Sequence, residues 1–173
     1  ARALLEYRYH ILDRARARAA KLRHRGALYP WRTINGKEAS AYFPAGTAQY
    51  HINADIIYGM RKYVNATGDR WFLLKRGAEM LFETARFWVD LGGYIEGRGF
   101  CINEVTGPDE YTTLVNNNVY TNMMAADHLR YAVQTYHEME AEDTSLLQTL
   151  CSRIELEERE VEEWDSAARQ IYI

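Results

Sequence analysis

Apolar residues recur at steps of three and four along most of this chain of 173 residues. Steps of three and four are the period of an amphipathic helix. They predict helices over residues 4–25, 48–66, 70–91, 119–138, 145–154 and 157–170. Short turns alternate with loops of about 20 residues between these segments, with one short extended piece at residues 99–102. The pattern predicts an all-α fold built from helical hairpins.

The two long loops are the candidate functional elements. If successive helices run antiparallel, loops separated by two helices emerge at the same end, so both loops are expected to face a common cleft. The first loop, residues 27–47, contains an Asn35-Gly36 turn signal. It also carries four aromatic side chains, Tyr29, Trp31, Tyr42 and Phe43. Their rings could stack on a sugar, or they could cover one end of the core.

The second loop leads into the segment VTGPDEYTTLVNNNVYTN, residues 105–122. Gly107 and Pro108 break regular structure, and the three asparagines favour turns. Asp109 and Glu110 place two carboxylates side by side in this loop. A carboxylic acid whose pKa is raised can protonate the leaving oxygen of a glycosidic bond, which makes Glu110 a candidate general acid. The alternative is a pair of carboxylates on a solvated turn.

Composition and motifs exclude several classes of protein. The net charge of −3 gives no attraction to nucleic acid or to an anionic membrane. No apolar run approaches the ~20 residues that span a bilayer, and the first residues contain no apolar signal core. The two cysteines lie far apart and outside metal-binding spacings. Phosphate loops, nucleophile elbows and zinc motifs are absent. We therefore expect a cytoplasmic protein without a metal site.

Two charged runs are interpreted as solvated helical faces. The first helix carries the arginines and lysine Arg14, Arg16, Arg18, Lys21, Arg23 and Arg25. They surround most of the helix instead of forming one stripe, and a second interpretation is that they pack on an acidic partner. The last helix carries an acidic run over residues 155–165.

Five blocks resemble, in family order, the glucosyl disaccharide phosphorylases of glycoside hydrolase family 65. They are GALYPWRTINGKEAS, GTAQYHINADIIY, YVNATGD, GAEMLFETARFW and VTGPDEYTTLVNNNVYTN. The first two look most like maltose phosphorylase. The resemblance implies an (α/α)6 barrel, of which residues 1–173 would form about half as a partial catalytic domain. The family's N-terminal β-sandwich, the remaining barrel helices and the C-terminal part would lie outside these residues, and such a fragment is expected to be inactive alone.

The family resemblance also implies a reaction. An inverting phosphorylase converts a glucose disaccharide and inorganic phosphate into β-glucose 1-phosphate and glucose. Glu110 would be the general acid and phosphate the nucleophile, with no other cofactor. The side chains expected at the sugar site are Trp31, Arg32, Glu38, His51, Asn53, Asp109 and Tyr111. Arg32 departs from the family, in which some members have an acidic residue at that position.

Other interpretations remain. Trehalose, kojibiose or nigerose could replace maltose as the substrate, or a related inverting hydrolase could use water in place of phosphate. A different class of protein, a non-catalytic helical interaction module, would place Glu110 in solvent and turn the aromatic loop away from it. The resemblance further implies a homodimer for the full-length protein.

Overall fold

The computed structural model describes residues 1–41, 44–109 and 111–173. The α-helices are α1 Arg2–His10, α2 Leu12–Lys21, α3 Ile52–Thr67, α4 Arg70–Phe72, α5 Ala78–Leu91, α6 Val119–Glu142, α7 Thr144–Ile154 and α8 Glu158–Gln170. A π-helical turn, η1 Leu73–Gly77, joins α4 to α5. Two antiparallel hairpins pair β1 Thr33–Ile34 with β2 Lys37–Glu38, and β3 Gly93–Ile95 with β4 Gly99–Cys101. The predicted all-α class is confirmed.

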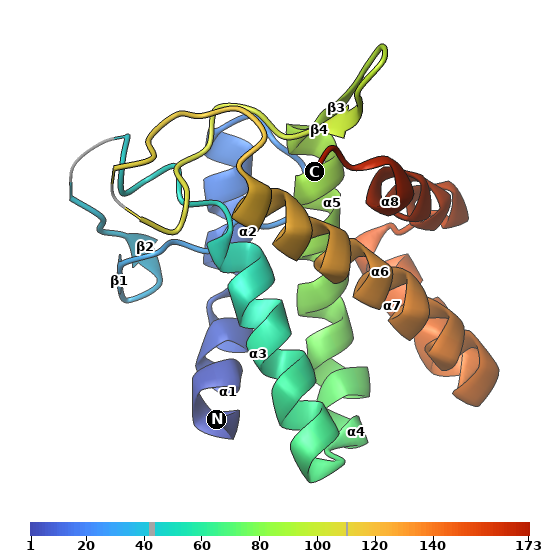
Figure 1. Ribbon diagram of the computed structural model, residues 1–173. Coiled ribbons are helices and arrows are strands. Elements are labelled where there is room, and N and C mark those ends of the chain that lie inside the picture. The colour runs from blue at the N-terminus through green and yellow to red at the C-terminus, as the bar shows by residue number, and fades with distance from the viewer. Residues whose placement is uncertain (42–43, 110) are drawn as a thin grey trace.

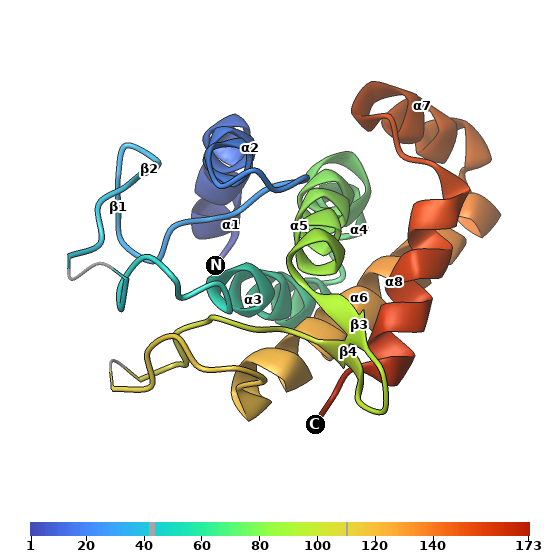
Figure 2. The same cartoon turned by 90° about the horizontal axis from the view of Figure 1, so that it is seen from above.

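Successive long helices run in opposite directions. In Figure 1, α2 and α5 run upward and α3 and α6 run back down. The described parts of the two long loops, residues 22–41, 44–51, 102–109 and 111–118, therefore both lie toward the upper end of the bundle, as the antiparallel pattern predicted. Seen from above, α5 lies at the centre, with α2 and α3 on one side and α6, α7 and α8 on the other (Figure 2).

The central helix α5 is buried on every side. Each of its residues from Ala78 to Trp88 is buried, including three charged ones. Trp88, Phe82 and Phe87 are among the largest fully buried side chains, together with Trp164 of α8. A helix that is surrounded in this way must pair its charges, because an unpaired buried ion loses its hydration without compensation.

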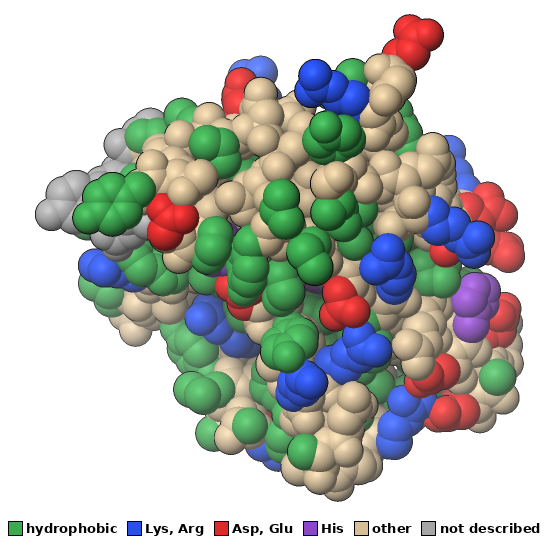
Figure 3. Space-filling view, viewed as in Figure 1, with side chains coloured by type: hydrophobic (Ala, Val, Ile, Leu, Met, Phe, Trp, Pro, Cys, Tyr) green, Lys and Arg blue, Asp and Glu red, His purple; other side chains and the backbone are tan. Residues whose placement is uncertain are grey.

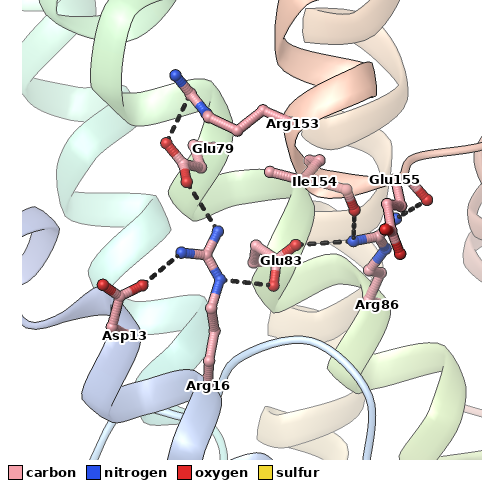
Figure 4. Close-up of a pocket in the computed structure, with 8 residues that line it drawn as sticks. All are labelled: Asp13, Arg16, Glu79, Glu83, Arg86, Arg153, Ile154 and Glu155. Atoms are coloured by element: carbon pink, nitrogen blue, oxygen red, sulfur yellow. Dashed lines mark hydrogen bonds and ion pairs between the residues drawn. The ribbon is translucent and has the colours of Figure 1, made fainter.

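The two glutamates of α5 are paired with arginines from neighbouring helices. Arg16 of α2 donates to Glu79 at 2.8 Å and to Glu83 at 3.1 Å. Arg153 of α7 reaches Glu79 from the opposite side at 2.7 Å. Figure 4 shows the cavity of about 470 Å³ around these groups, in which the charges point toward one another. The prediction of a solvated helical face is therefore wrong at Arg16.

Arg86 of α5 is the most heavily bonded residue of this network. It donates to both carboxylate oxygens of Glu160 at 2.8 Å and to Glu83 at 2.7 Å. It also donates to the carbonyl oxygens of Ile154 and Glu155, at 2.7 Å each, where α7 ends. Burial alone would raise the pKa of Glu160, but its bonds from Arg86 and from the Glu157 amide, together with the charges of Arg86 and Arg25, lower it. Glu160 is only 3% exposed, so the prediction of a solvated acidic face is wrong there.

The first predicted helix is divided in two. It breaks at Ile11 and ends at Lys21 instead of residue 25. The tip of the β1–β2 hairpin lies against this break, and a Cβ on Gly36 would stand 2.8 Å from Ile11 Cγ2. Asn35 and Gly36 both have positive φ, as a type I′ turn requires, which confirms the predicted turn. The sequence contains no glycine or proline near Ile11 that would signal the break.

One exposed face of the bundle is apolar. In Figure 3, hydrophobic side chains gather over α3 and the beginning of α6, with basic and acidic side chains around them. Tyr58 of α3 is 45% exposed and Met123 of α6 is 55% exposed. Both line a cavity of about 370 Å³ between the two helices. The described residues leave this face uncovered. None of the helices in the described ranges has the length and apolarity needed to cross a membrane.

A neutral histidine lies in the core between α5 and α6. Trp88 Nε1 donates to His128 Nδ1 at 3.2 Å, so this nitrogen accepts. His128 Nε2, which then carries the hydrogen, lies 3.0 Å from Thr84 Oγ1 and 3.3 Å from the Leu81 carbonyl. Burial lowers the pKa of His128 to about 4. A second proton would have to bind Nδ1, which faces the N–H donor of Trp88, so the new N–H would have no hydrogen-bond acceptor there.

The lowered pKa of His128 predicts that the protein loses stability in mild acid. The folded-state pKa of about 4 lies below the ordinary 6.5, so the unfolded chain takes up the proton first as the pH falls. The contribution is fully present above pH 6.5 and is lost as the pH approaches 4, which corresponds to about 3 kcal/mol. Urea unfolding between pH 7 and pH 4.5 measures it. His128→Gln should flatten the dependence, whereas His137→Gln, at an exposed position on α6, should not. Equal slopes for wild type and His128→Gln would contradict this account.

Candidate active site

The two long loops meet above the beginnings of α3 and α6. The amide of Thr106, from the second loop, donates to the carbonyl oxygen of Ala48, from the end of the first, at 3.0 Å. Val105 and Val115 exchange backbone hydrogen bonds of 3.1 and 2.9 Å, which close the second loop on itself. The sequence motifs from both loops thus lie at one end of the bundle (Figure 1).

Asp109 shapes the tip of the second loop. Its carboxylate accepts hydrogen bonds from the amides of Tyr111 and Thr112, at 2.9 and 2.8 Å, and from the Thr112 hydroxyl at 2.6 Å. The bonds from Thr112, followed by that from Tyr111, hold the pKa of Asp109 below its ordinary value. Asp109 therefore remains an anion that caps the turn. The Tyr111 side chain is 98% exposed.

Three predicted positions cannot be placed. Glu110, the candidate acid, lies outside the described residues, and so do Tyr42 and Phe43 of the aromatic loop. Glu110 as the general acid stays a prediction.

Arg18 of α2 anchors the first loop at three points. Its guanidinium donates to the carbonyl oxygens of Tyr29 at 2.8 Å and Thr47 at 2.7 Å. It also forms an ion pair of 2.5 Å with Glu38 on β2. The prediction of a solvated face is therefore wrong at Arg18 as well. Glu38, predicted at the sugar site, binds Arg18 and accepts from the Ser40 amide at 2.8 Å.

The remaining predicted residues of the first loop differ in exposure. Tyr29 is fully buried, which fits the alternative that this ring belongs to the core. Trp31 is half-buried, and the exposed Arg32 lies over its ring at 4.4 Å from the centroid. A guanidinium in this position is attracted to the aromatic face. Trp31 and Arg32 thus present a joint aromatic and cationic surface on the first loop.

Asn53 of α3 supports the first loop from below. Its side-chain oxygen accepts from the Tyr29 amide, and its NH₂ donates to the Ala27 carbonyl, both at 2.9 Å. The residue has no exposed surface. Its observed bonds therefore hold the backbone that carries Trp31, while the predicted contact with sugar is not tested by this geometry.

His51 lies two residues before Asn53, at the beginning of α3, and belongs to a polar chain that joins two helices. His51 Nδ1 is 2.7 Å from Asp55 Oδ2, and the Tyr120 hydroxyl of α6 donates to Asp55 Oδ1 at 2.8 Å. The His51 and Tyr120 rings meet edge to face at 5.6 Å. Burial and the bond to Asp55 raise the pKa of Tyr120 to about 12, so its hydroxyl keeps its proton.

Arg18, Asp55 and Tyr120 are site residues that the sequence did not reveal. His51 and Asp55 stand four residues apart, a spacing that places side chains together on a helix, so this pair had a local signal. Tyr120 had none, because its contact with Asp55 spans 65 residues. Among the described residues, no group of three or more His, Cys, Asp or Glu side chains could hold a metal ion.

Comparison with known proteins gives a consistent result. The model of the glycosyl hydrolase family 65 central catalytic domain matches residues 1–173. An α,α-trehalose phosphorylase from Thermoanaerobacter brockii is 57% identical over all of this chain and 23% of its own length. A kojibiose phosphorylase from Halothermothrix orenii is 38% identical over all of this chain and 24% of its own.

A solved structure is similar as well. A putative kojibiose phosphorylase from the human microbiome superposes with a TM-score of 0.88 and 30% identity, over 98% of this chain and 25% of that one. The predicted fold, part of an (α/α)6 barrel, is confirmed.

The predicted likeness to maltose phosphorylase in particular is not supported. The maltose phosphorylase of Bacillus subtilis is 36% identical over 98% of this chain, less than the trehalose phosphorylase above. Two short blocks suggested maltose, whereas identity over the whole chain ranks the relatives differently. The chain spans about a quarter of the length of these relatives, and over its whole length it belongs to glycosyl hydrolase family 65, within the central catalytic domain.

Proposed function

We propose that the full-length protein is an inverting disaccharide phosphorylase that converts α,α-trehalose and inorganic phosphate into β-glucose 1-phosphate and glucose. The observation that carries this proposal is the match of the whole chain to the family's catalytic domain, joined to 57% identity with an α,α-trehalose phosphorylase. Maltose, kojibiose and nigerose are the competing substrates. Family membership supports a disaccharide and phosphate as the reactants.

The proposed chemistry assigns one proton transfer to Glu110. Its carboxylic acid protonates the glycosidic oxygen as the bond from that oxygen to the anomeric carbon breaks, and glucose leaves. A phosphate oxygen attacks the anomeric carbon from the opposite face, which inverts its configuration. Phosphate is already an anion, so no second carboxylate is needed to activate it. Asp109 is a poor alternative acid, because its hydrogen bonds hold its pKa low.

Residues 1–173 are proposed to form only part of the catalytic domain. The uncovered apolar face of α3 and α6 supports this view, because large exposed apolar patches mark surfaces that bind another element. The remaining barrel helices would cover that face in the full-length protein. A homodimer stays a prediction.

The test is a product assay on the full-length protein. Trehalose, maltose, kojibiose and nigerose are each incubated with phosphate, and the products are followed by ³¹P and ¹H NMR. We expect β-glucose 1-phosphate, formed fastest from trehalose, and no product from isolated residues 1–173. Release of glucose alone, at the same rate without phosphate, would identify a hydrolase. No turnover of any disaccharide would favour the interaction module.

A further inference from the structure

Asp55 determines which nitrogen of His51 carries the hydrogen. A carboxylate only accepts hydrogen bonds, so His51 Nδ1, 2.7 Å from Asp55 Oδ2, is the protonated nitrogen. In the neutral ring Nε2 then holds a lone pair and is an acceptor. The hydroxyl of Tyr120 occupies the other carboxylate oxygen at 2.8 Å. Asp55 cannot turn away from His51 without losing both bonds.

The acceptor nitrogen of His51 has no partner among the described residues. The side chain is 5% exposed, and Nε2 itself is buried and unbonded. Such an atom has lost its hydration without gaining a hydrogen bond, and a ligand that donates one removes this cost. The buried hydroxyl of Thr106, in the loop that bonds to Ala48, is unpartnered too. Orphaned polar atoms thus come from both loops.

We propose that Asp55, braced by Tyr120, is a positioning residue that holds His51 with Nδ1 protonated, so that Nε2 accepts a hydrogen bond from a hydroxyl of the sugar. Asp55 does not touch the sugar and acts through His51, as a carboxylate does when it fixes the orientation of a neighbouring imidazole. The inference rests on the function proposed above, since a sugar substrate supplies the hydroxyl.

A second polar contact joins α3 to α6 without involving a histidine. Arg61 of α3 and Asp127 of α6 form such a contact at 2.9 Å, on the same pair of helices. Both side chains are more than one-third exposed. Asp127→Asn therefore provides a matched control, because it neutralises an aspartate that bridges the same two helices away from His51. Asp127 lies on the face that the remaining barrel helices would cover, so circular dichroism of the full-length variant must match that of the wild type.

The kinetic test uses the full-length enzyme and a double-mutant cycle. Asp55→Asn is expected to lower kcat/KM for the disaccharide by about 10- to 100-fold, mainly through KM, and to leave KM for phosphate unchanged. The double variant with His51→Gln should be no worse than His51→Gln alone, because Asp55 acts only through His51. Asp127→Asn should resemble wild type. Should Asp55→Asn not fold, Tyr120→Phe, which removes the hydroxyl and keeps the ring, replaces it in the cycle.

A spectroscopic readout tests the same idea without turnover. With ¹⁵N-labelled histidine, the His51 signals, assigned by their loss in His51→Gln, should show a protonated Nδ1 and a bare Nε2. Asp55→Asn should change this pattern and Asp127→Asn should not. A protonated Nε2 in the neutral wild-type ring, or multiplicative effects of Asp55→Asn and His51→Gln, would overturn the inference while leaving the function intact. An inactive wild type would instead overturn the function first, and the inference with it.

Discussion

Replacing Glu110 by glutamine is expected to lower kcat of the full-length enzyme for disaccharide phosphorolysis by about 10²- to 10⁴-fold, the usual contribution of a general acid. Glutamine cannot donate a proton to the leaving oxygen, although it has nearly the same shape. Asp109 cannot replace Glu110, because three hydrogen bonds keep it ionised. The initial rate of β-glucose 1-phosphate release measures the loss.

Two comparisons isolate the proton transfer from other effects of the substitution. α-Glucosyl fluoride has a leaving group that departs without protonation, so Glu110→Gln should retain most of its activity toward this substrate. Glu104→Gln removes an exposed carboxylate from the same loop and should leave both activities unchanged. If Glu110→Gln folds and retains most of its activity toward the disaccharide, Glu110 is not the acid.

The Arg86→Met substitution is expected to destabilise the protein by about 3–5 kcal/mol, as the breaking of a buried ion pair does. Methionine fills much of the space but leaves the carboxylates of Glu83 and Glu160 short of a partner at 6% and 4% exposure. The carbonyl oxygens of Ile154 and Glu155 also lose their donor. Urea unfolding followed by circular dichroism measures the change.

An exposed ion pair on α8 supplies the control for Arg86. Arg169 lies 2.9 Å from Asp165, and the two side chains are 75% and 40% exposed. Solvent-exposed pairs contribute about 0–1 kcal/mol, so Arg169→Met should be nearly neutral. Adding Glu160→Gln to Arg86→Met should restore part of the stability, because it removes one unpaired charge. Equal effects of Arg86→Met and Arg169→Met would contradict a buried network.

The helices could be predicted because each has an apolar period, and α3 is a clear case, with Ala54, Ile57, Met60 and Val64 on its buried face. The break at Ile11 could not, since no glycine or proline near it signals an end, and the hairpin tip that lies against it comes from Gly36, 25 residues further along the chain. The burial and pairing of Arg16 and Glu160 could not be predicted for a related reason. Periodicity gives the face of a helix on which a charge lies, but not whether another helix covers that face.

In the candidate site, too, contacts between residues close in the sequence could be predicted, whereas contacts between distant residues could not. The turn around Asp109 could be predicted from Gly107 and Pro108, and the pairing of His51 with Asp55 follows from their spacing on one helix. The orienting bond from Tyr120 arises only when α6 packs beside α3. The bonds of Asn53 could not be predicted either, because its amide atoms bind the backbone of Ala27 and Tyr29 in the first loop, and the sugar contact that the family resemblance implies for it stays a prediction.

Arg18 and Asn53 hold the backbone of the first loop, whereas Trp31 and Arg32 form part of its outer surface. Both residues bind main-chain carbonyl or amide groups, which are present whatever the side chain, apart from the missing N–H of proline. Only the ion pair of Arg18 with Glu38 depends on a side chain of the loop. Trp31 and Arg32 contribute only side chains to the exposed surface, and Asn53 bonds their neighbour Tyr29 through its amide alone. The side chains on this surface can therefore be exchanged without rebuilding the loop.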